Sequence, residues 1–238
     1  MAKSATAKNT RIHVLVPAAG TGQRFGGPVP KQYISLCGKP IIQHSLECLL
    51  EIFDQITVAI SDEDDYWNEL EIAKDSRISR VVGGETRAES VRNALKSISD
   101  AKGGDWVLIH DAVRPLVSAS DINRLISKLS EHPSGGLLGT PVYETVKRVS
   151  TDCEVLRTED REGLWAAQTP QLFRFDGLLE AMDSAEKLDK ITDEASAMEA
   201  AGHKLQAVEG SPMNIKITRQ ADLEFAELIL SSQARSQQ

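Results

Sequence analysis

Apolar and polar positions alternate on two different scales along the first half of the chain. Short, nearly continuous apolar runs over residues 11–16, 55–60, 78–82 and 106–109 predict strands buried in a sheet. The stretches 40–52 and 86–98 instead space their apolar residues as an amphipathic helix does. Strands that alternate with helices predict an α/β fold, with a doubly wound, mostly parallel sheet and helices on both faces.

The stretch 143–161 departs from this pattern. Scattered valines are mixed there with charged residues and flank the turn-forming sequence Ser150-Thr151-Asp152, which predicts an exposed β-hairpin. Such a hairpin can be an arm that pairs with a second subunit, or a simple surface flap. Beyond it we expect helices at 175–187, 192–201 and 219–230, and strands at 204–208 and 215–217. We therefore expect one domain over 11–232, with 143–161 as a β-arm for dimerisation.

Composition and charge narrow the classes of function. Of the 238 residues, 41% are apolar and 26% charged, as in ordinary soluble globular proteins. The net charge of −8 argues against a general nucleic-acid binder. No apolar run is long enough to span a bilayer, and residues 1–10 lack the apolar core of a secretory signal, so we expect a disordered tail there. Three cysteines without metal-ligand spacing indicate reduced thiols and a cytoplasmic location.

A glycine-rich segment, residues 17–27, follows the first predicted strand directly. Ligands of doubly wound sheets bind at the carboxyl ends of strands, and small residues leave backbone N–H groups free to bind phosphate oxygens. The Walker pattern is absent, and Phe25 stands where a dinucleotide-binding loop has its third glycine. Arg24 and Lys31 would instead stabilise the negative charge of a phosphoryl or nucleotidyl transfer. The alternative is a structural turn with two surface cations.

A second polar cluster, the sequence HDAVRP at 110–115, follows the predicted strand 106–109. Asp111 can bind a divalent metal or accept hydrogen bonds from a ribose or polyol hydroxyl. Arg114 can bind a phosphate. A helix-capping aspartate with a local arginine partner is the alternative. His110 is more typical of a packed strand end, and we assign it no role.

Three further places are ambiguous from the residues alone. The glycine pair at 83–84 can expose backbone groups that read a base edge, with Ser90 as an added hydroxyl, but a turn and a helix cap also explain this stretch. Thr192 stands where a predicted helix begins, as a capping residue would. Lys216 is out of phase with its apolar neighbours, which is expected of a solvent-facing position on an alternating strand.

Taken together, nine motifs make the chain resemble the 2-C-methyl-D-erythritol 4-phosphate cytidylyltransferase family of the non-mevalonate isoprenoid pathway, over about 11–230. They are, in order, PAAGTGQRFG, PKQY, GGETRAESV, HDAVRP, ETVKR, DREGLW, QTPQLF, ITDEASAME and NIKIT. The resemblance implies a Rossmann-like nucleotidyltransferase fold and the transfer of a cytidylyl group from CTP to methylerythritol phosphate. Val113 and Glu144 depart from the alanine and aspartate that are usual in the family.

The resemblance also implies roles for individual residues. Arg24, Lys31, Arg161 and Lys216 would be catalytic, the first two at the pentacoordinate α-phosphorus. The arm would cross to a neighbouring subunit of a homodimer, where Thr145 and Arg161 would complete the partner's acceptor site. Asp111 would hold Mg²⁺. The nucleotide would be bound by Pro17, Ala18, Ala19, Gly20, Gly22, Gly84, Glu85, Ser90, Asp111 and Ala112, and the acceptor by Asp111, Arg114, Thr145, Arg161 and Thr192.

Such a reaction needs no general base, because the attacking phosphate has a second pKa of about 6. Three alternatives are a ribitol-5-phosphate cytidylyltransferase, a catalytically silent nucleotide-binding subunit and a nicotinamide oxidoreductase. The presence of Arg24, Lys31 and Asp111 argues against the second, and Phe25 argues against the third. The partners that we expect are CTP, methylerythritol phosphate and a second copy of the chain, with no nucleic acid and no membrane.

Overall fold

The computed structural model of the chain describes residues 10–20, 29–185, 188 and 191–236. The predicted tail at 1–10, apart from Thr10, lies outside the described residues. So do Gly22, Arg24 and Phe25 of the glycine-rich segment.

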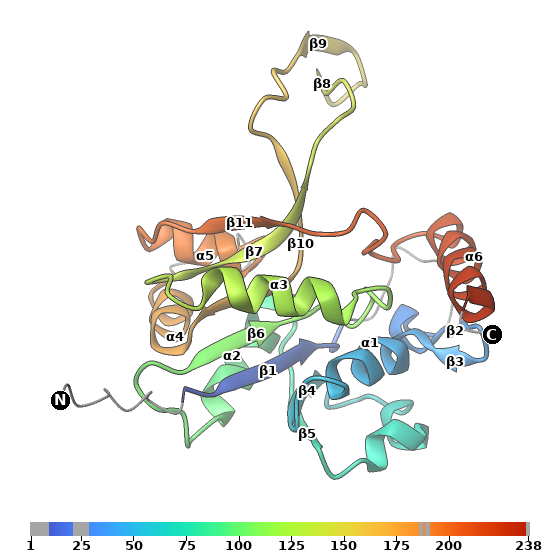
Figure 1. The fold of residues 1–238 in the computed structure, drawn as a ribbon, viewed down its shortest axis with the longest axis vertical. Coiled ribbons are helices and arrows are strands. Elements are labelled where there is room, and N and C mark those ends of the chain that lie inside the picture. Colours follow the sequence, from blue (N-terminus) through green and yellow to red (C-terminus); the bar gives the residue numbers. More distant parts are fainter. Residues whose placement is uncertain (1–9, 21–28, 186–187, 189–190, 237–238) are drawn as a thin grey trace, which may run out of the picture.

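Seven strands form one central sheet in the order β11-β7-β10-β6-β1-β4-β5 (Figure 1). β1 pairs in parallel with β6 and β4, β4 with β5, and β7 with β11, whereas β10 is antiparallel to both β6 and β7. The predicted α/β fold with a mostly parallel sheet is thereby confirmed. The strands are β1 (Ile12–Pro17), β4 (Ile56–Ile60), β5 (Ile78–Val82), β6 (Trp106–Ile109), β7 (Gly135–Pro141), β10 (Trp165–Arg174) and β11 (Gln206–Glu209).

The central strands are apolar throughout because both of their faces are covered. In β1, Val14 and Val16 pack into the core on one face of the sheet, and Leu15 packs into the core on the other. In β6, Leu108 packs into the same core as Val14 and Val16, and Val107 packs into the same core as Leu15. Helices α1 (Ile41–Leu50) and α3 (Ala119–Leu129) cover the first face, and α2 (Arg87–Ser97), α4 (Phe175–Ser184) and α5 (Glu194–Ala200) cover the second.

Smaller elements complete the body of the molecule. The short strands β2 (Ser35–Leu36) and β3 (Lys39–Pro40) pair with each other, and α6 (Gln220–Ser236) packs against this pair. Short 3₁₀ turns span Lys31–Tyr33, Trp67–Glu69 and Glu71–Lys74. Over the part of the chain that the structure describes, no helix is long and apolar enough to cross a membrane.

Strands β8 (Lys147–Val149) and β9 (Val155–Thr158) pair antiparallel and project from the body on the extensions of β7 and β10 (Figure 1). We call residues 143–161 the arm. Every residue of β8 and β9 is exposed, and large apolar side chains there, such as Val155 and Leu156, have no partner layer in a single chain.

Several elements differ from the expectation. The helix predicted to reach residue 187 ends at Ser184, and residues 215–217 form no strand. Instead, the N–H of Ile217 donates to the carbonyl of Val113. Helix α3 and strands β7 and β10 were not predicted. In β7 the reason is its glycines: a Cβ on Gly136 would lie 1.9 Å from the carbonyl oxygen of Gln206, so close strand packing excludes the side chains that make a pattern.

Candidate active site

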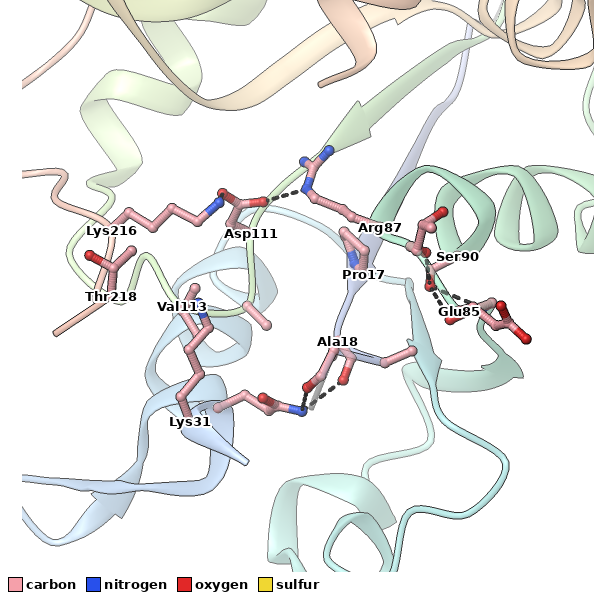
Figure 2. A pocket seen from close by; sticks show the side chains of 16 residues that line it. Pro17, Ala18, Lys31, Glu85, Arg87, Ser90, Asp111, Val113, Lys216 and Thr218 are labelled. Carbon is pink, nitrogen blue, oxygen red and sulfur yellow. Dashed lines mark hydrogen bonds and ion pairs between the residues drawn. The ribbon is translucent and has the colours of Figure 1, made fainter. Parts of the chain in front are cut away.

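A cavity of about 500 Å³ opens at the carboxyl ends of β1 and β6 (Figure 2). The chain passes from β1 outward through β4 and β5, then returns to β6 on the other side of β1, so the strand order reverses at this place. Open α/β sheets bind their ligands at such a reversal. The lining residues are Pro17, Ala18, Ala19, Gly20, Lys31, Gln32, Gly84, Glu85, Thr86, Arg87, Ser90, Asp111, Ala112, Val113, Lys216 and Thr218.

The start of the glycine-rich segment is held from two sides. The N–H of Ala18 donates to the carbonyl of Ala59, 2.8 Å away, which ties the segment to β4. The buried amide of Gln32 donates to the carbonyls of Ala18 and Gly20, at 2.9 and 3.0 Å. Since Gln32 belongs to the same 3₁₀ turn as Lys31, this contact also fixes where Lys31 enters the cavity.

The segment before α2 packs closely against this loop. A Cβ on Gly83 would lie 2.4 Å from the Cβ of Ala19, so only glycine permits the contact. The N–H of Gly84 donates to Ser90 Oγ at 3.0 Å, and Ser90 Oγ donates to the carbonyl of Thr86 at 2.9 Å. Thr86 caps α2 in a capping box with Glu89. Thr86 therefore both caps α2 and lines the cavity.

Asp111 lies among three cations. Its Oδ2 accepts from Lys216 Nζ at 2.8 Å and lies 3.5 Å from Arg114 Nε, while its Oδ1 accepts from Arg87 Nε at 2.9 Å (Figure 2). Burial would raise the pKa of Asp111, but the charges of Arg87, Lys216 and Arg114 outweigh it and hold the pKa well below its usual range. Asp111 is therefore a carboxylate at every physiological pH.

Arg87 also pairs with Glu194, which does not line the cavity. Its terminal nitrogens donate to both carboxylate oxygens of Glu194, at 2.6 and 3.0 Å. Burial lowers the pKa of Arg87, and the charges of Glu194 and Asp111 more than restore it, so the guanidinium stays charged. Neither Arg87 nor Glu194 was predicted as a site residue, although they stand in the motifs GGETRAESV and ITDEASAME.

The turn that carries Asp111 is anchored from behind. Thr169 Oγ1 accepts from the N–H of Asp111 at 3.0 Å and contacts His110 Nδ1 at 3.1 Å. His110 Nε2 lies 3.1 Å from the carbonyl of Arg114, and burial lowers the pKa of His110 to about 4, so the ring is neutral and packed in the turn. Arg114 donates to the carbonyls of Asn214 and Ala167, at 2.7 and 3.3 Å, and does not line the cavity.

The family of the chain follows from comparison. A sequence model of the 2-C-methyl-D-erythritol 4-phosphate cytidylyltransferases matches residues 12–232. The chain belongs to this family. Its relatives include the enzyme of that name from Vibrio vulnificus (strain CMCP6), 44% identical over 93% of this chain and 95% of the relative. That of Pseudomonas entomophila (strain L48) is 45% identical over 89% of this chain and 92% of the relative.

Solved structures agree with this assignment. The crystal structure of the Francisella tularensis 2-C-methyl-D-erythritol 4-phosphate cytidylyltransferase covers 92% of this chain and 99% of its own, at 41% identity and a TM-score of 0.81. A crystal structure of a 4-diphosphocytidyl-2C-methyl-D-erythritol synthase gives a TM-score of 0.82 at 33% identity, over 94% of this chain and all of its own.

Of the residues that the family resemblance singled out, the described ones for the nucleotide gather in the cavity. Lys216 does so too, because the segment around it is an irregular loop and its Nζ turns to Asp111; the solvent-facing interpretation was wrong. Thr145 and Arg161 lie on the exposed arm, where Arg161 donates to the carbonyl of Tyr143. Thr192 is exposed ahead of α5 and lies outside the cavity lining, whereas Arg24 and Gly22 are not among the described residues.

Five lining residues were not predicted. Thr86, Arg87 and Gln32 stand beside predicted site residues within quoted motifs, and that proximity was the available signal. Val113 and Thr218 were likewise within or at the end of such motifs.

The donor atoms of the cavity bear on the predicted metal. Within the described ranges, no group of three or more His, Cys, Asp or Glu residues could hold a metal ion. Asp111 and Glu85 are the carboxylates that line the cavity, and Asp111 is already surrounded by cations. These residues fit Mg²⁺ as an ion that a triphosphate brings with it, because such sites take most of their oxygens from phosphates and waters.

Proposed function

We propose that the chain transfers the cytidylyl group of CTP to 2-C-methyl-D-erythritol 4-phosphate. The products are pyrophosphate and 4-diphosphocytidyl-2-C-methyl-D-erythritol. The observation that carries the proposal is the cavity itself: a backbone-lined loop, Lys31, Lys216 and an always-ionised Asp111 meet at the strand-order reversal of a chain of this family. Ribitol 5-phosphate is not favoured as acceptor, since the family and the relatives carry the name of the methylerythritol phosphate enzyme.

The nucleotide occupies the side of the cavity formed by β1 and α2. Backbone groups of 17–20, continued by Gly22, contact the phosphates, and Gly84, Glu85 and Ser90 contact the cytosine. Asp111 and Ala112 border the ribose. This arrangement is supported by the close contact of Gly83 with Ala19, which brings residues 17–20 and 84–90 to the same cavity.

The chemistry is an in-line displacement at the α-phosphorus. An oxygen of the acceptor phosphate forms a bond to that phosphorus while the bond to the bridging oxygen of pyrophosphate breaks. The attacking phosphate is ionised at neutral pH, so the protein has to offset repulsion between two anions rather than remove a proton. Lys31, Arg24 and Lys216 supply fixed positive charge for this. Asp111 would hold Mg²⁺, which lowers the negative charge of the phosphates when bound.

We further propose that the chain works as a homodimer in the cytoplasm. Thr145 and Arg161 lie on the arm and would meet the acceptor at the second subunit, where Thr192 and Arg114, outside the cavity lining, would complete the acceptor site. The exposed apolar side chains of the arm support a protein partner, since isolated chains rarely leave such a group uncovered. Free thiols at Cys37, Cys48 and Cys153 are consistent with a reducing compartment.

The test is pyrophosphate release from CTP with Mg²⁺ and either acceptor, methylerythritol phosphate or ribitol 5-phosphate. We expect turnover with the first acceptor and at most a small fraction of that rate with the second. Equal turnover with both, or none with methylerythritol phosphate, would contradict the proposal. Binding of NAD, measured in parallel, should be undetectable.

A further inference from the structure

Glu194 is the first residue of α5, and its side chain is completely buried beneath the cavity. It does not line the cavity, so it cannot touch a bound ligand directly. Burial raises the pKa of Glu194 above its usual range, and the charge and hydrogen bonds of Arg87 offset only part of this. The two-pronged contact, at 2.6 and 3.0 Å, matches both carboxylate oxygens to both terminal nitrogens of Arg87.

Stability alone does not explain this pair. Removing two charges from water costs several kcal/mol per ion, and a buried ion pair is often no more stable than apolar residues of the same volume. Of its neighbours along α5, Ala195, Ala197 and Met198 are buried in the core, and Asp193 and Ser196 form the cap of the helix. Within α5 nothing pairs with the carboxylate, whose partner is Arg87. The presence of a carboxylate at position 194 is therefore to be explained by what Arg87 does at the cavity.

The explanation lies in Nε, the third donor nitrogen of Arg87. The guanidinium is planar, so fixing its two terminal nitrogens also fixes the direction of Nε, which donates to Asp111 Oδ1 at 2.9 Å. Figure 2 shows Arg87 reaching Asp111 from one side and Lys216 from the other. With Lys216 on Oδ2, both oxygens of Asp111 then have a defined orientation.

The same bonds determine what Arg87 cannot do. Its side chain lines the cavity and is 27% exposed, within reach of any polyanion that enters. Yet all three of its donor nitrogens are directed at Glu194 and Asp111. Without Glu194, two of those nitrogens would lose their partner while the positive charge remained in the cavity wall.

We propose that Glu194 is a positioning residue of the transfer reaction: it holds Arg87 so that Arg87 orients Asp111 and is withheld from the triphosphate. The inference rests on the proposed cytidylyl transfer. A guanidinium released from Glu194 binds the triphosphate of the ground state, and binding that is no stronger in the transition state does not raise kcat. Loss of the orientation of Asp111 lowers kcat at the same time.

The experiment compares Glu194→Gln, which keeps the shape but removes the charge, with Arg87→Lys, which keeps the charge but removes the planar fork. For Glu194→Gln we expect kcat to fall about tenfold, the effect typical of losing a supporting partner behind a site residue. The Kd for CTP, measured by calorimetry, should fall, because the released guanidinium of Arg87 can bind the triphosphate; an unchanged Kd would show that Glu194 does not withhold Arg87. For Arg87→Lys we expect a similar fall in kcat with a Kd for CTP near that of the unmodified chain.

Asp105→Asn is the matched control, because Asp105 is also a buried carboxylate and stands at the opposite end of β6. It should lower Tm and leave kcat and the Kd for CTP unchanged. A folded Glu194→Gln or Arg87→Lys chain with the kcat of the unmodified protein would overturn the inference, as would a Kd for CTP raised tenfold. If Glu194→Gln shows no cooperative melting, Arg87→Lys decides. If the unmodified chain has no turnover, the proposed function fails, and the CTP affinities alone decide the inference.

Discussion

The cavity and the arm differ in how they hold their site residues. Those of the cavity come from separate segments of one chain, and hydrogen bonds such as Gln32 to Ala18 and Gly84 to Ser90 fix them before any ligand arrives. Thr145 and Arg161, on the arm, are exposed, and the contact of Arg161 is with its own arm. One half of the proposed site is pre-formed within a chain, and the other half depends on where the arm is placed.

This difference teaches that the two substrates meet different physical demands. CTP enters a surface whose ordering cost has already been met in folding, which favours binding by a preorganised site. The acceptor, if it meets Thr145 and Arg161, meets them only after two chains associate. Substitutions in the cavity should therefore affect each chain alone, whereas substitutions in the arm should be rescued by a second chain.

The largest effect is expected from Lys31→Ala. Because Lys31 would supply positive charge near the reacting phosphates in the proposed mechanism, kcat should fall at least ~100-fold, as when one charge-stabilising donor of a transition state is lost. Tm should stay within a few degrees of the unmodified value. Steady-state pyrophosphate release and thermal melting measure the two quantities. Lys39→Ala, which removes an exposed lysine paired with Glu47, is the control and should keep normal turnover. Normal turnover by Lys31→Ala would remove Lys31 from the mechanism.

The second prediction tests the cavity and the arm together. Inactive Arg161→Ala and Lys31→Ala chains, unfolded and refolded together, should form hybrid dimers in which one of the two sites has both residues intact. Random association makes half of the dimers hybrids, so we expect about a quarter of the normal activity. Activity is measured against the same chains refolded separately and then combined. A mixture no more active than its parents would show that each site is built from a single chain.

A smaller effect is expected within the cavity from Gln32→Leu. The substitution fills the same space but leaves the carbonyls of Ala18 and Gly20 without their donor, which costs about 1–3 kcal/mol of unfolding free energy. The loosened loop should also raise the Kd for CTP several-fold. Urea unfolding and calorimetry measure both. An unchanged CTP affinity would mean that this loop does not contact the nucleotide.

The smallest effect compares two helix caps. Thr86→Ala and Ser118→Ala each remove a side chain that accepts the N–H three residues later, in α2 and α3 respectively. Each should cost about 1 kcal/mol of unfolding free energy and lower Tm by about 2–4 °C. Thr86 lines the cavity, so its loss alone should also weaken CTP binding; equal binding by both variants would argue that the cap is purely structural.

The sequence was sufficient for the fold where hydrophobic patterning is strong. β5 and β6 have the predicted bounds, and α2 differs by one residue at each end. It was insufficient where packing rather than pattern sets the structure. β7 begins with glycines at 135 and 136, where neighbouring backbones come too close for side chains, so its periodicity is not visible in the sequence.

The candidate site, too, was predictable from the sequence only in part. Motifs located Asp111 and the loops around it, since each follows a predicted strand. Arg87 and Glu194 lie 107 positions apart, and no local pattern indicates that they meet. The expected alternating strand put Lys216 toward solvent, whereas residues 215–217 are irregular and Ile217 bonds to Val113; the family resemblance, not the pattern, pointed to Lys216. Long-range ion pairs and irregular backbone need the three-dimensional arrangement.

The extension of β7 and β10 into the arm has a consequence for how the arm is aimed. Pairing continues past the sheet, with the N–H of Val142 bonded to the carbonyl of Leu164 and that of Glu159 to Val146. The same β10 holds Asp111 through Thr169. The arm is thus a continuation of two strands of the sheet, and their direction sets the direction of the arm. Two residues inserted in each of its strands would carry its tip about 7 Å outward, whereas one residue in each would turn its faces over.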